Sequence, residues 1–290
     1  MVTWVNATLA HSRLSRELLA RQVVLACVLE VSASKPGNIT PAHDFSDTTY
    51  ADMVRSALAL GPVFARPNVL RRSVGELISD GVDATSRVAG ANTNLGIVLL
   101  FAPLARAAVM RQADEPLRAA VQRILAELGI GDAAAAFPAI LRATPGGLGE
   151  APEHDVRAPA RVTLREGMAA AAHRDSIASE YATGYAIVFD GGLPLLVQAL
   201  DAGAATLEAI VLLYLGLLAA QPDTLIARKA GDAAARAVSV AAREVLDGTR
   251  SVAELDAALR VDGNRLNPGT TADLVAGTLL AALLSGVRLP

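Results

Sequence analysis

Apolar residues along this chain recur at three- and four-residue steps, and no run shows sustained alternation of β-branched and polar positions. A period of three to four residues is typical of helices with one buried face, whereas alternation is typical of strands. The pattern therefore predicts an all-α protein with these helices: Leu14–Val31, Thr49–Leu60, Val69–Arg87, Asn92–Met110, Pro116–Leu128, Asp132–Arg142, Thr163–Tyr185, Ala204–Ala220, Asp232–Leu246, Val252–Leu259 and a last apolar helix from about Leu274 to Val287.

Proline and glycine mark the predicted boundaries. Gly61-Pro62 is expected to end the second helix, and Pro103 is expected to kink or break the fourth. The longest irregular stretch is Thr144–Arg161, which suits either a lid over a substrate or a crossover between two helical halves. We expect residues 1–290 to form a single globular multi-helix domain with buried central helices, with a two-lobe split near 144–161 as the alternative.

The composition supports a large core. Hydrophobic residues make up 52% of the chain and charged residues 19%, with few aromatics, which favours close-packed Ala- and Leu-rich helices. A net charge of −3 gives no broad basic field for nucleic acid. One cysteine, Cys27, allows no internal disulfide, and Glu208, Pro103 and Arg106 interrupt the oiliest segments. We therefore expect a cytoplasmic protein with no nucleic-acid or membrane partner, and its Ala-rich apolar helices would suit a homodimer.

The stretch from Asn267 to Leu274 carries the strongest chemical signal. A sharp turn there delivers two hydroxyls and a carboxylate to the start of an apolar helix. Free backbone N–H groups and the helix dipole at such a corner can hold a phosphate. Asp273 could hold Mg²⁺ or accept a proton. The candidate substrate-binding residues at this corner are Asn267, Gly269, Thr270 and Thr271.

A second corner follows the break at Pro222. Asp223 and Thr224 begin a turn, with Arg228 and Lys229 about one helical turn later. A carboxylate, a hydroxyl and two cations of this kind match a Mg²⁺–phosphate clamp. The competing interpretation is helix capping, with the cations serving the helix C-terminus.

Two further polar groups lie in the first half of the chain. Lys35 precedes a Pro-Gly turn that could present its ammonium to a phosphate, and His43-Asp44 places a proton carrier beside a carboxylate. A polar surface loop is the competing interpretation. The other group is an N-cap pattern in which Gly96 would let a ligand approach the backbone, and its residues are Asn92, Thr93 and Asn94. Neither a P-loop nor a Gly-x-Gly-x-x-Gly fingerprint is present.

Taken in order, these motifs resemble the triphosphoribosyl-dephospho-CoA synthase family over roughly residues 20–285. The matching stretches are Glu30…Lys35-Pro36-Gly37-Asn38…His43-Asp44, Asn92-Thr93-Asn94-Leu95-Gly96, Asp223-Thr224…Arg228…Gly231 and Asn267-Pro268-Gly269-Thr270-Thr271-Ala272-Asp273-Leu274. The resemblance implies an all-α enzyme in which the 2′-hydroxyl of 3′-dephospho-CoA attacks C1 of the ATP ribose. Adenine leaves, and the triphosphate stays on the ribose.

That chemistry needs a carboxylate near an oxocarbenium-like centre, a base, an acid for adenine, and Mg²⁺ with cations for the triphosphate. The resemblance assigns Lys35, Asn38, Arg228, Lys229 and Thr224 to the substrates, together with the polar residues at 92–94 and 267–271. His43 could protonate adenine. Asp44, Asp223 and Asp273 are candidates for base or metal ligand, and the sequence does not rank them.

The chain also departs from the citrate-lyase-type members of that family. A His and two Lys of their motifs are missing, including the Lys between the positions of His43 and Asp44. The sequence resembles the divergent branch found in archaea and in bacteria that use tetrahydromethanopterin. An alternative is therefore an ATP-using enzyme that makes a C1-carrier cofactor of the methanopterin or methanofuran type. A non-enzymatic helical binding protein, with scattered caps and an exposed apolar patch, is the third hypothesis.

Overall fold

The computed structural model describes residues 14–89, 93–143, 155–261 and 263–289, and within these ranges every named element is helical. One isolated antiparallel bridge joins Thr40 and His43. The predicted all-α class is confirmed. The elements are α1 Arg16–Ser32, α2 Tyr50–Ala65, η1 Val69–Arg71, α3 Val74–Ser86, α4 Leu95–Met110, α5 Leu117–Ala126, α6 Ile130–Arg142, α7 Leu164–Ala171, α8 Ser176–Thr183, the π-helical η2 Ile187–Gly192, α9 Leu193–Asp201, α10 Thr206–Ala220, α11 Thr224–Ala230, α12 Asp232–Leu246, α13 Val252–Leu259 and α14 Gly269–Leu284.

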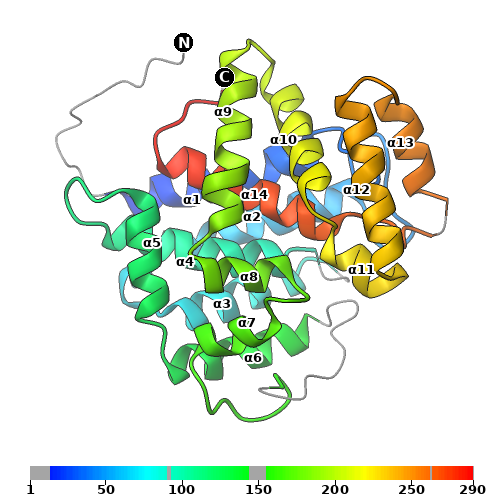
Figure 1. Cartoon of the computed structure of the whole chain (residues 1–290). Helices are drawn as coiled ribbons and strands as arrows, with labels where there is room; N and C mark the ends of the chain where they lie inside the picture. Colours follow the sequence, from blue (N-terminus) through cyan, green and yellow to red (C-terminus); the bar gives the residue numbers. More distant parts are fainter. Residues whose placement is uncertain (1–13, 90–92, 144–154, 262, 290) are drawn as a thin grey trace.

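Two helices, α4 and α14, form the centre of the molecule. Both are apolar on nearly every side, as expected for helices surrounded by others. Figure 1 shows α14 running through the middle of the protein, and it packs against α1, α4, α8, α10 and η2. The predicted buried central helices are therefore confirmed. Because α14 follows the 144–161 stretch and packs on helices that precede it, this contact joins the two halves of the chain.

Pro103 lies inside α4 without ending it, and two tyrosines explain how. A proline cannot donate to the carbonyl four residues earlier, which here belongs to Leu99. The hydroxyl of Tyr181 donates to that carbonyl at 2.6 Å, and Tyr185 donates to the Leu100 carbonyl at 2.8 Å. Both tyrosines are fully buried. Side chains from α8 and from the residues just after it thus satisfy the backbone groups around the proline.

Several predicted boundaries differ from the structure. The predicted helix Val69–Arg87 is divided into η1 and α3, because Ser73 caps a new helix start, and α14 begins at Gly269 instead of near Leu274. α2 continues through Pro62 to Ala65 instead of ending at Gly61-Pro62. The predicted helix Thr163–Tyr185 is divided into α7 and α8, because Asp175 caps a new helix start. The irregular stretch was predicted at 144–161, and its residues 144–154, where a lid or crossover was expected, lie outside the described residues.

In the described parts of the chain, no single helix is both long and apolar enough to cross a membrane. Three sharply bent helix pairs reach the required length and composition when taken together: Leu117–Ala126 with Ile130–Arg142, Ser176–Thr183 with Ile187–Asp201, and Thr206–Ala220 with Thr224–Ala230.

Candidate active site

The first turns of α8, α11 and α14 are joined by hydroxyl groups. The backbone N–H of Ser176, at the start of α8, donates to Oγ1 of Thr224 at 3.3 Å. The Thr224 hydroxyl in turn donates to Oγ1 of Thr270, at the start of α14, at 3.2 Å. Two residues predicted to bind substrate therefore lie side by side, although 46 positions separate them. Helix N-termini that meet in this way concentrate positive potential in one place.

Asp223 ties α11 to α14 through both of its carboxylate oxygens. Oδ1 accepts from the N–H groups of Leu225 and Ile226 at 2.8 and 3.1 Å, and so caps α11. Oδ2 accepts from the N–H and the hydroxyl of Thr271 at 2.7 and 2.8 Å. Burial raises the pKa of Asp223, and these same hydrogen bonds oppose that rise. Four donors occupy the roughly four lone-pair sites of a carboxylate, which leaves Asp223 little capacity for a metal or a proton.

Asp273 is placed differently, at the contact between α4 and α14. Its carboxyl group lies directly against Gly96 in the first turn of α4. A Cβ atom at Gly96 would stand 2.0 Å from Oδ2 and 2.5 Å from Cγ of Asp273. No described residue donates a hydrogen bond to this carboxyl group. The missing side chain at Gly96 is therefore what makes room for Asp273 between the two central helices.

The surroundings of Asp273 favour its protonated form. Burial raises the pKa of its carboxyl group well above the ordinary value. The nearby carboxylates of Glu30, Asp223 and Asp175 raise the pKa further, whereas Arg228 lowers it. Like charges close together disfavour ionisation of one of them. A titratable group with a strongly shifted pKa, facing several charged partners, is a recognised mark of a functional site.

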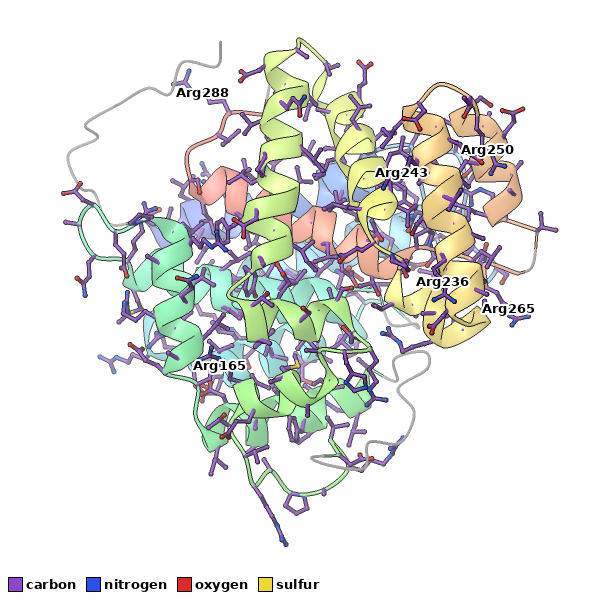
Figure 2. All side chains as sticks on the ribbon, viewed as in Figure 1. Arg165, Arg236, Arg243, Arg250, Arg265 and Arg288 are labelled. Atoms are coloured by element: carbon purple, nitrogen blue, oxygen red, sulfur yellow. The ribbon has the colours of Figure 1, made fainter. Side chains whose placement is uncertain are left out.

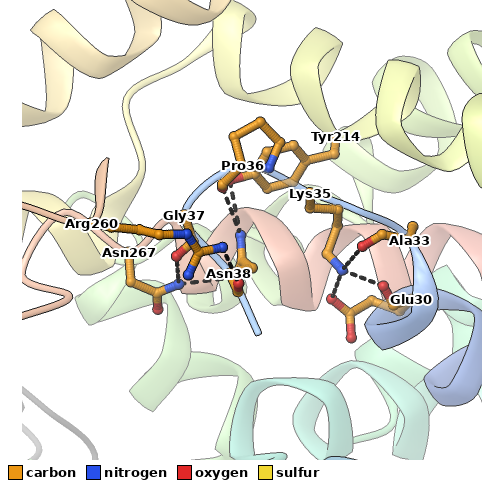
Figure 3. A network of polar contacts seen from close by, with 9 residues as sticks. All are labelled: Glu30, Ala33, Lys35, Pro36, Gly37, Asn38, Tyr214, Arg260 and Asn267. Atoms are coloured by element: carbon orange, nitrogen blue, oxygen red, sulfur yellow. Dashed lines mark hydrogen bonds and ion pairs between the residues drawn. The ribbon is translucent and has the colours of Figure 1, made fainter. Parts of the chain in front are cut away.

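The ammonium group of Lys35 is buried and bonded to residues of its own segment. Its Nζ lies 3.0 Å from Oε1 of Glu30 and donates to the Ala33 carbonyl at 3.4 Å and to the Glu30 carbonyl, as Figure 3 shows. The side chains of Lys35 and Glu30 are 0% and 5% exposed. All three ammonium protons therefore have partners inside the protein, and Lys35 holds Glu30, which is one of the carboxylates acting on Asp273.

The loop that follows Lys35 is fixed to the turn before α14. Nδ2 of Asn267 donates to Oδ1 of Asn38 and to the Gly37 carbonyl, both at 2.9 Å (Figure 3). Asn38 donates to the hydroxyl of Tyr214 at 2.9 Å, and its carbonyl accepts from Arg260 at 2.7 Å. Gly37 adopts a φ of +73°, which other residues rarely do. Two predicted substrate-binding residues, Asn38 and Asn267, thus bind each other.

The cations of α11 lie at the edge of this arrangement. Nη1 of Arg228 pairs with Oδ2 of Asp175 at 2.7 Å. Lys229 is exposed, and its backbone carbonyl accepts from Arg265 at 3.1 Å. Arg265 and Arg236 both extend from the surface formed by α12 and the loop before α14 (Figure 2). Basic side chains therefore lie on the surface near the helix starts, together with the exposed Asp232 at the start of α12.

The predicted residues His43 and Asp44 lie at the surface, and Thr93 lies against α2. His43 and Asp44 are exposed, and Asp44 accepts from the Tyr50 N–H at 2.6 Å at the start of α2. No described hydrogen bond connects either residue to the helix starts around Asp273. Oγ1 of Thr93 lies 2.7 Å from the Ser56 hydroxyl on α2.

The start of α4 contains a buried donor without a partner. Asn94 occupies the N-cap position but makes no side-chain capping bond, and its Nδ2 is buried with no acceptor among the described residues. Asn92 lies outside the described residues. Gly269 begins α14 against Leu225, where a Cβ would stand 2.7 Å from the leucine Cδ2. That close contact brings the starts of α11 and α14 together.

We found no group of three or more His, Cys, Asp or Glu side chains placed to hold a metal ion in the described ranges. Among the three predicted ligands, Asp223 is already hydrogen-bonded on both oxygens and Asp44 is at the surface. Asp273 is the one whose carboxyl oxygens have no described hydrogen bond. A Mg²⁺ ion bound here would take most of its ligands from water and from substrate phosphates, as is usual for Mg²⁺.

Carboxylates, hydroxyls and cations gathered at helix starts in an all-α protein are typical of an enzyme that binds phosphorylated substrates. The chain belongs to the CitG family of ATP:dephospho-CoA triphosphoribosyl transferases, which matches residues 16–289. The predictions of this family and of a transferase are thereby confirmed, and the non-enzymatic hypothesis is excluded.

Two similar proteins bear related names. A Stutzerimonas stutzeri protein named "Probable 2-(5''-triphosphoribosyl)-3'-dephosphocoenzyme-A synthase" is 29% identical over 286 residues, covering 91% of this chain and 90% of its own. The crystal structure of a "putative triphosphoribosyl-dephospho-coA synthase" from Archaeoglobus fulgidus matches with a TM-score of 0.63 and 26% identity. That match covers 82% of this chain and 99% of the archaeal chain.

Proposed function

We propose that this protein transfers the triphosphoribosyl group of ATP to the 2′-hydroxyl of 3′-dephospho-CoA and releases adenine. The observation that carries the proposal is the carboxyl group of Asp273, which lies without a described hydrogen bond where the first turns of α4 and α14 meet. Membership of the family supports the same reaction.

In this reaction the bond from C1 of the ribose to N9 of adenine breaks, and a bond from C1 to the acceptor oxygen forms. Adenine leaves more readily when it receives a proton. Because burial and neighbouring carboxylates raise the pKa of Asp273, the protonated form is favoured. We assign Asp273 the role of the acid that protonates adenine. The assignment replaces His43, which is exposed and not connected to the helix starts.

The triphosphate is assigned to the N-terminal turns of α4 and α14. The Nδ2 of Asn94, which has no acceptor among the described residues, and the guanidinium of Arg228 are donors suited to phosphate oxygens. Beside the protonated Asp273, the three carboxylates of Glu30, Asp223 and Asp175 outnumber two side-chain cations, Arg228 and Lys35. A triphosphate would be repelled by this excess unless it brought its own counter-charge. We therefore propose that ATP binds as its Mg²⁺ complex.

The acceptor is tested by incubating the purified protein with Mg-ATP and 3′-dephospho-CoA and separating the products by chromatography. Adenine released only in the presence of dephospho-CoA, together with a triphosphoribosylated product, supports the proposal. ADP or AMP in place of adenine would contradict it. The alternative acceptor class, precursors of C1-carrier cofactors, rests on the resemblance to the divergent branch of the family, and adenine release with such a precursor alone would establish it.

Two aspartate variants test the assignment of roles. Asp273→Asn should lower kcat about 10²- to 10⁴-fold, the usual range for a lost general acid. It should leave the free energy of unfolding unchanged or higher, since it removes a poorly solvated carboxyl group. Asp223→Asn should instead destabilise the protein, because an amide cannot accept from all four donors. Wild-type turnover by a folded Asp273→Asn protein would remove Asp273 from the reaction.

We also propose an oligomeric state and a cellular location for the protein. An apolar groove of about 430 Å³ lies between α1 and α2, apart from the residues around Asp273, and Leu25 beside it is 41% exposed. We propose that the protein forms a homodimer, and light scattering at micromolar concentration tests this, with a monomer as the contradicting result. Because its single cysteine, Cys27, is buried and allows no internal disulfide, which is usual for cytoplasmic proteins, we also propose a cytoplasmic location.

A further inference from the structure

Asp175 uses its two carboxylate oxygens for two different tasks. Oδ1 accepts from the N–H groups of Ile177 and Ala178 at 2.8 and 3.2 Å and so caps α8. Oδ2 lies 2.7 Å from Nη1 of Arg228 on α11. The capping bonds fix the carboxylate to the start of α8, so that the second oxygen is a fixed anchor for the guanidinium.

Arg228 has donors left after this contact. A guanidinium carries five N–H donors in a planar fork, and the structure gives Arg228 a single bond, through Nη1, within the described residues. Its side chain is 19% exposed, and that of Asp175 is 30% exposed. Both residues act electrostatically on Asp273. Arg228 therefore lies near the proposed reaction centre and has N–H donors that no described residue occupies.

We propose that Asp175 is a positioning residue for ATP, which holds Arg228 so that the free edge of its guanidinium meets the triphosphate. This inference rests on the proposed function. It differs from a purely structural role, in which Asp175 would only cap α8. It also differs from a direct role, in which Asp175 would bind Mg²⁺ or compete with the phosphates for Arg228.

Asp175→Asn separates these roles, since asparagine caps helices as well as aspartate does. Its Oδ1 can still accept from Ile177 and Ala178, whereas an amide N–H₂ replaces the oxygen that anchors Arg228. Partly exposed ion pairs contribute modestly, so we expect the Kd and KM for Mg-ATP to rise about two- to fivefold, with Tm nearly unchanged. Asp83→Asn is the matched control, because it removes the carboxylate from an exposed pair with Arg142 that joins α3 to α6.

A double-mutant cycle gives the decisive comparison. If Asp175 acts only through Arg228, then Asp175→Asn should have no further effect on ATP binding in an Arg228→Met protein. Additive losses would overturn the inference, because Asp175 would then act on the substrate or its metal directly. An unchanged Kd for Asp175→Asn would also overturn the inference, because Asp175 would then only cap α8. A lower Kd would overturn it as well, because Asp175 would then compete with the phosphates for Arg228.

Calorimetric titration with Mg-ATP makes the test of Asp175 independent of whether the protein catalyses the proposed reaction. Binding of Mg-ATP is measured without an acceptor, so the cycle can be completed even if wild-type protein releases no adenine. Absence of adenine with every acceptor would contradict the proposed function. A cycle without coupling between Asp175 and Arg228, in a wild-type protein that does release adenine, would contradict this inference alone.

Discussion

Replacing Gly96 with alanine tests whether the position of Asp273 matters for turnover. The new methyl group would stand 2.0 Å from Oδ2 of Asp273, whereas such contacts are normally at least 3.0 Å. Asp273 or the start of α4 must therefore move by about 1 Å, and a misplacement of that size can cost about 10²-fold in kcat. Overpacking at the same point should lower the free energy of unfolding by about 1–3 kcal/mol. Adenine release and urea unfolding measure the two effects.

Two comparisons make the Gly96→Ala result specific. Gly131→Ala, in the first turn of α6, adds a methyl group with no atom within 4 Å and should leave both activity and stability intact. In an Asp273→Ala background the side chain of residue 273 ends at Cβ, 3.2 Å from the new methyl group, so Gly96→Ala should then cost much less stability. Near-normal turnover by folded Gly96→Ala protein would refute the idea that Asp273 must be held at its present position.

Three further variants test the interior by urea unfolding. Tyr181→Phe should cost about 1–3 kcal/mol, because the Leu99 carbonyl loses its donor; no change would show that the carbonyl finds another partner. Lys35→Met should cost about 3–5 kcal/mol by leaving Glu30 buried and unpaired, and adding Glu30→Gln should restore much of it; a double variant as unstable as the single would contradict this. Burial raises the pKa of Glu180 from 4.5 to about 7, so its protonated form favours the folded state, and stability should fall as pH rises from 4.5 to 7. That contribution to the slope should disappear in Glu180→Gln.

The hydrophobic pattern was sufficient for the fold class because most helices have apolar residues at helical spacing and clear breaks. It was least informative at Pro62 and Pro103, which interrupt the pattern without ending a helix. At Pro103 the compensating hydrogen bonds come from Tyr181 and Tyr185, which lie more than 80 positions away from their acceptors in α4, so no local rule predicts them. Tertiary contacts of this kind decide whether a proline ends a helix or is accommodated.

Asp175 shows what local rules could have found. The hydrophobic pattern predicts Asp175 as an interior position of the helix Thr163–Tyr185. Aspartate is a strong N-cap residue, however, and α8 begins directly after it in the structure. The preceding Ala-rich residues favour helix so strongly that they hide the break. The pair with Arg228 could not be predicted, because 53 positions separate the two residues and only the packing of α8 and α11 brings them together.

The sequence predicts which residue types belong to the candidate site, but it does not predict which of them contact each other. The sequence indicated that Asp223 and Asp273 belong to phosphate chemistry but could not rank them, since both precede or begin a helix with hydroxyls beside them. Ranking required knowing which oxygens are already hydrogen-bonded. Asp223 accepts four hydrogen bonds, whereas Asp273 faces Gly96, from 177 positions earlier in the chain, a separation across which no sequence spacing is informative.

Helix capping and substrate binding are alternative interpretations of the polar residues at the helix starts. In the structure the two are linked, because the capping residues also position the proposed substrate-binding groups. Asp223 caps α11 and at the same time holds Thr271 in the first turn of α14. Asp175 caps α8 and holds Arg228. Each cap therefore fixes the start of one helix relative to another, and together they place the first turns around Asp273. A variant that removes a cap should move the reactive groups, which is why conservative changes that keep the cap are the informative ones.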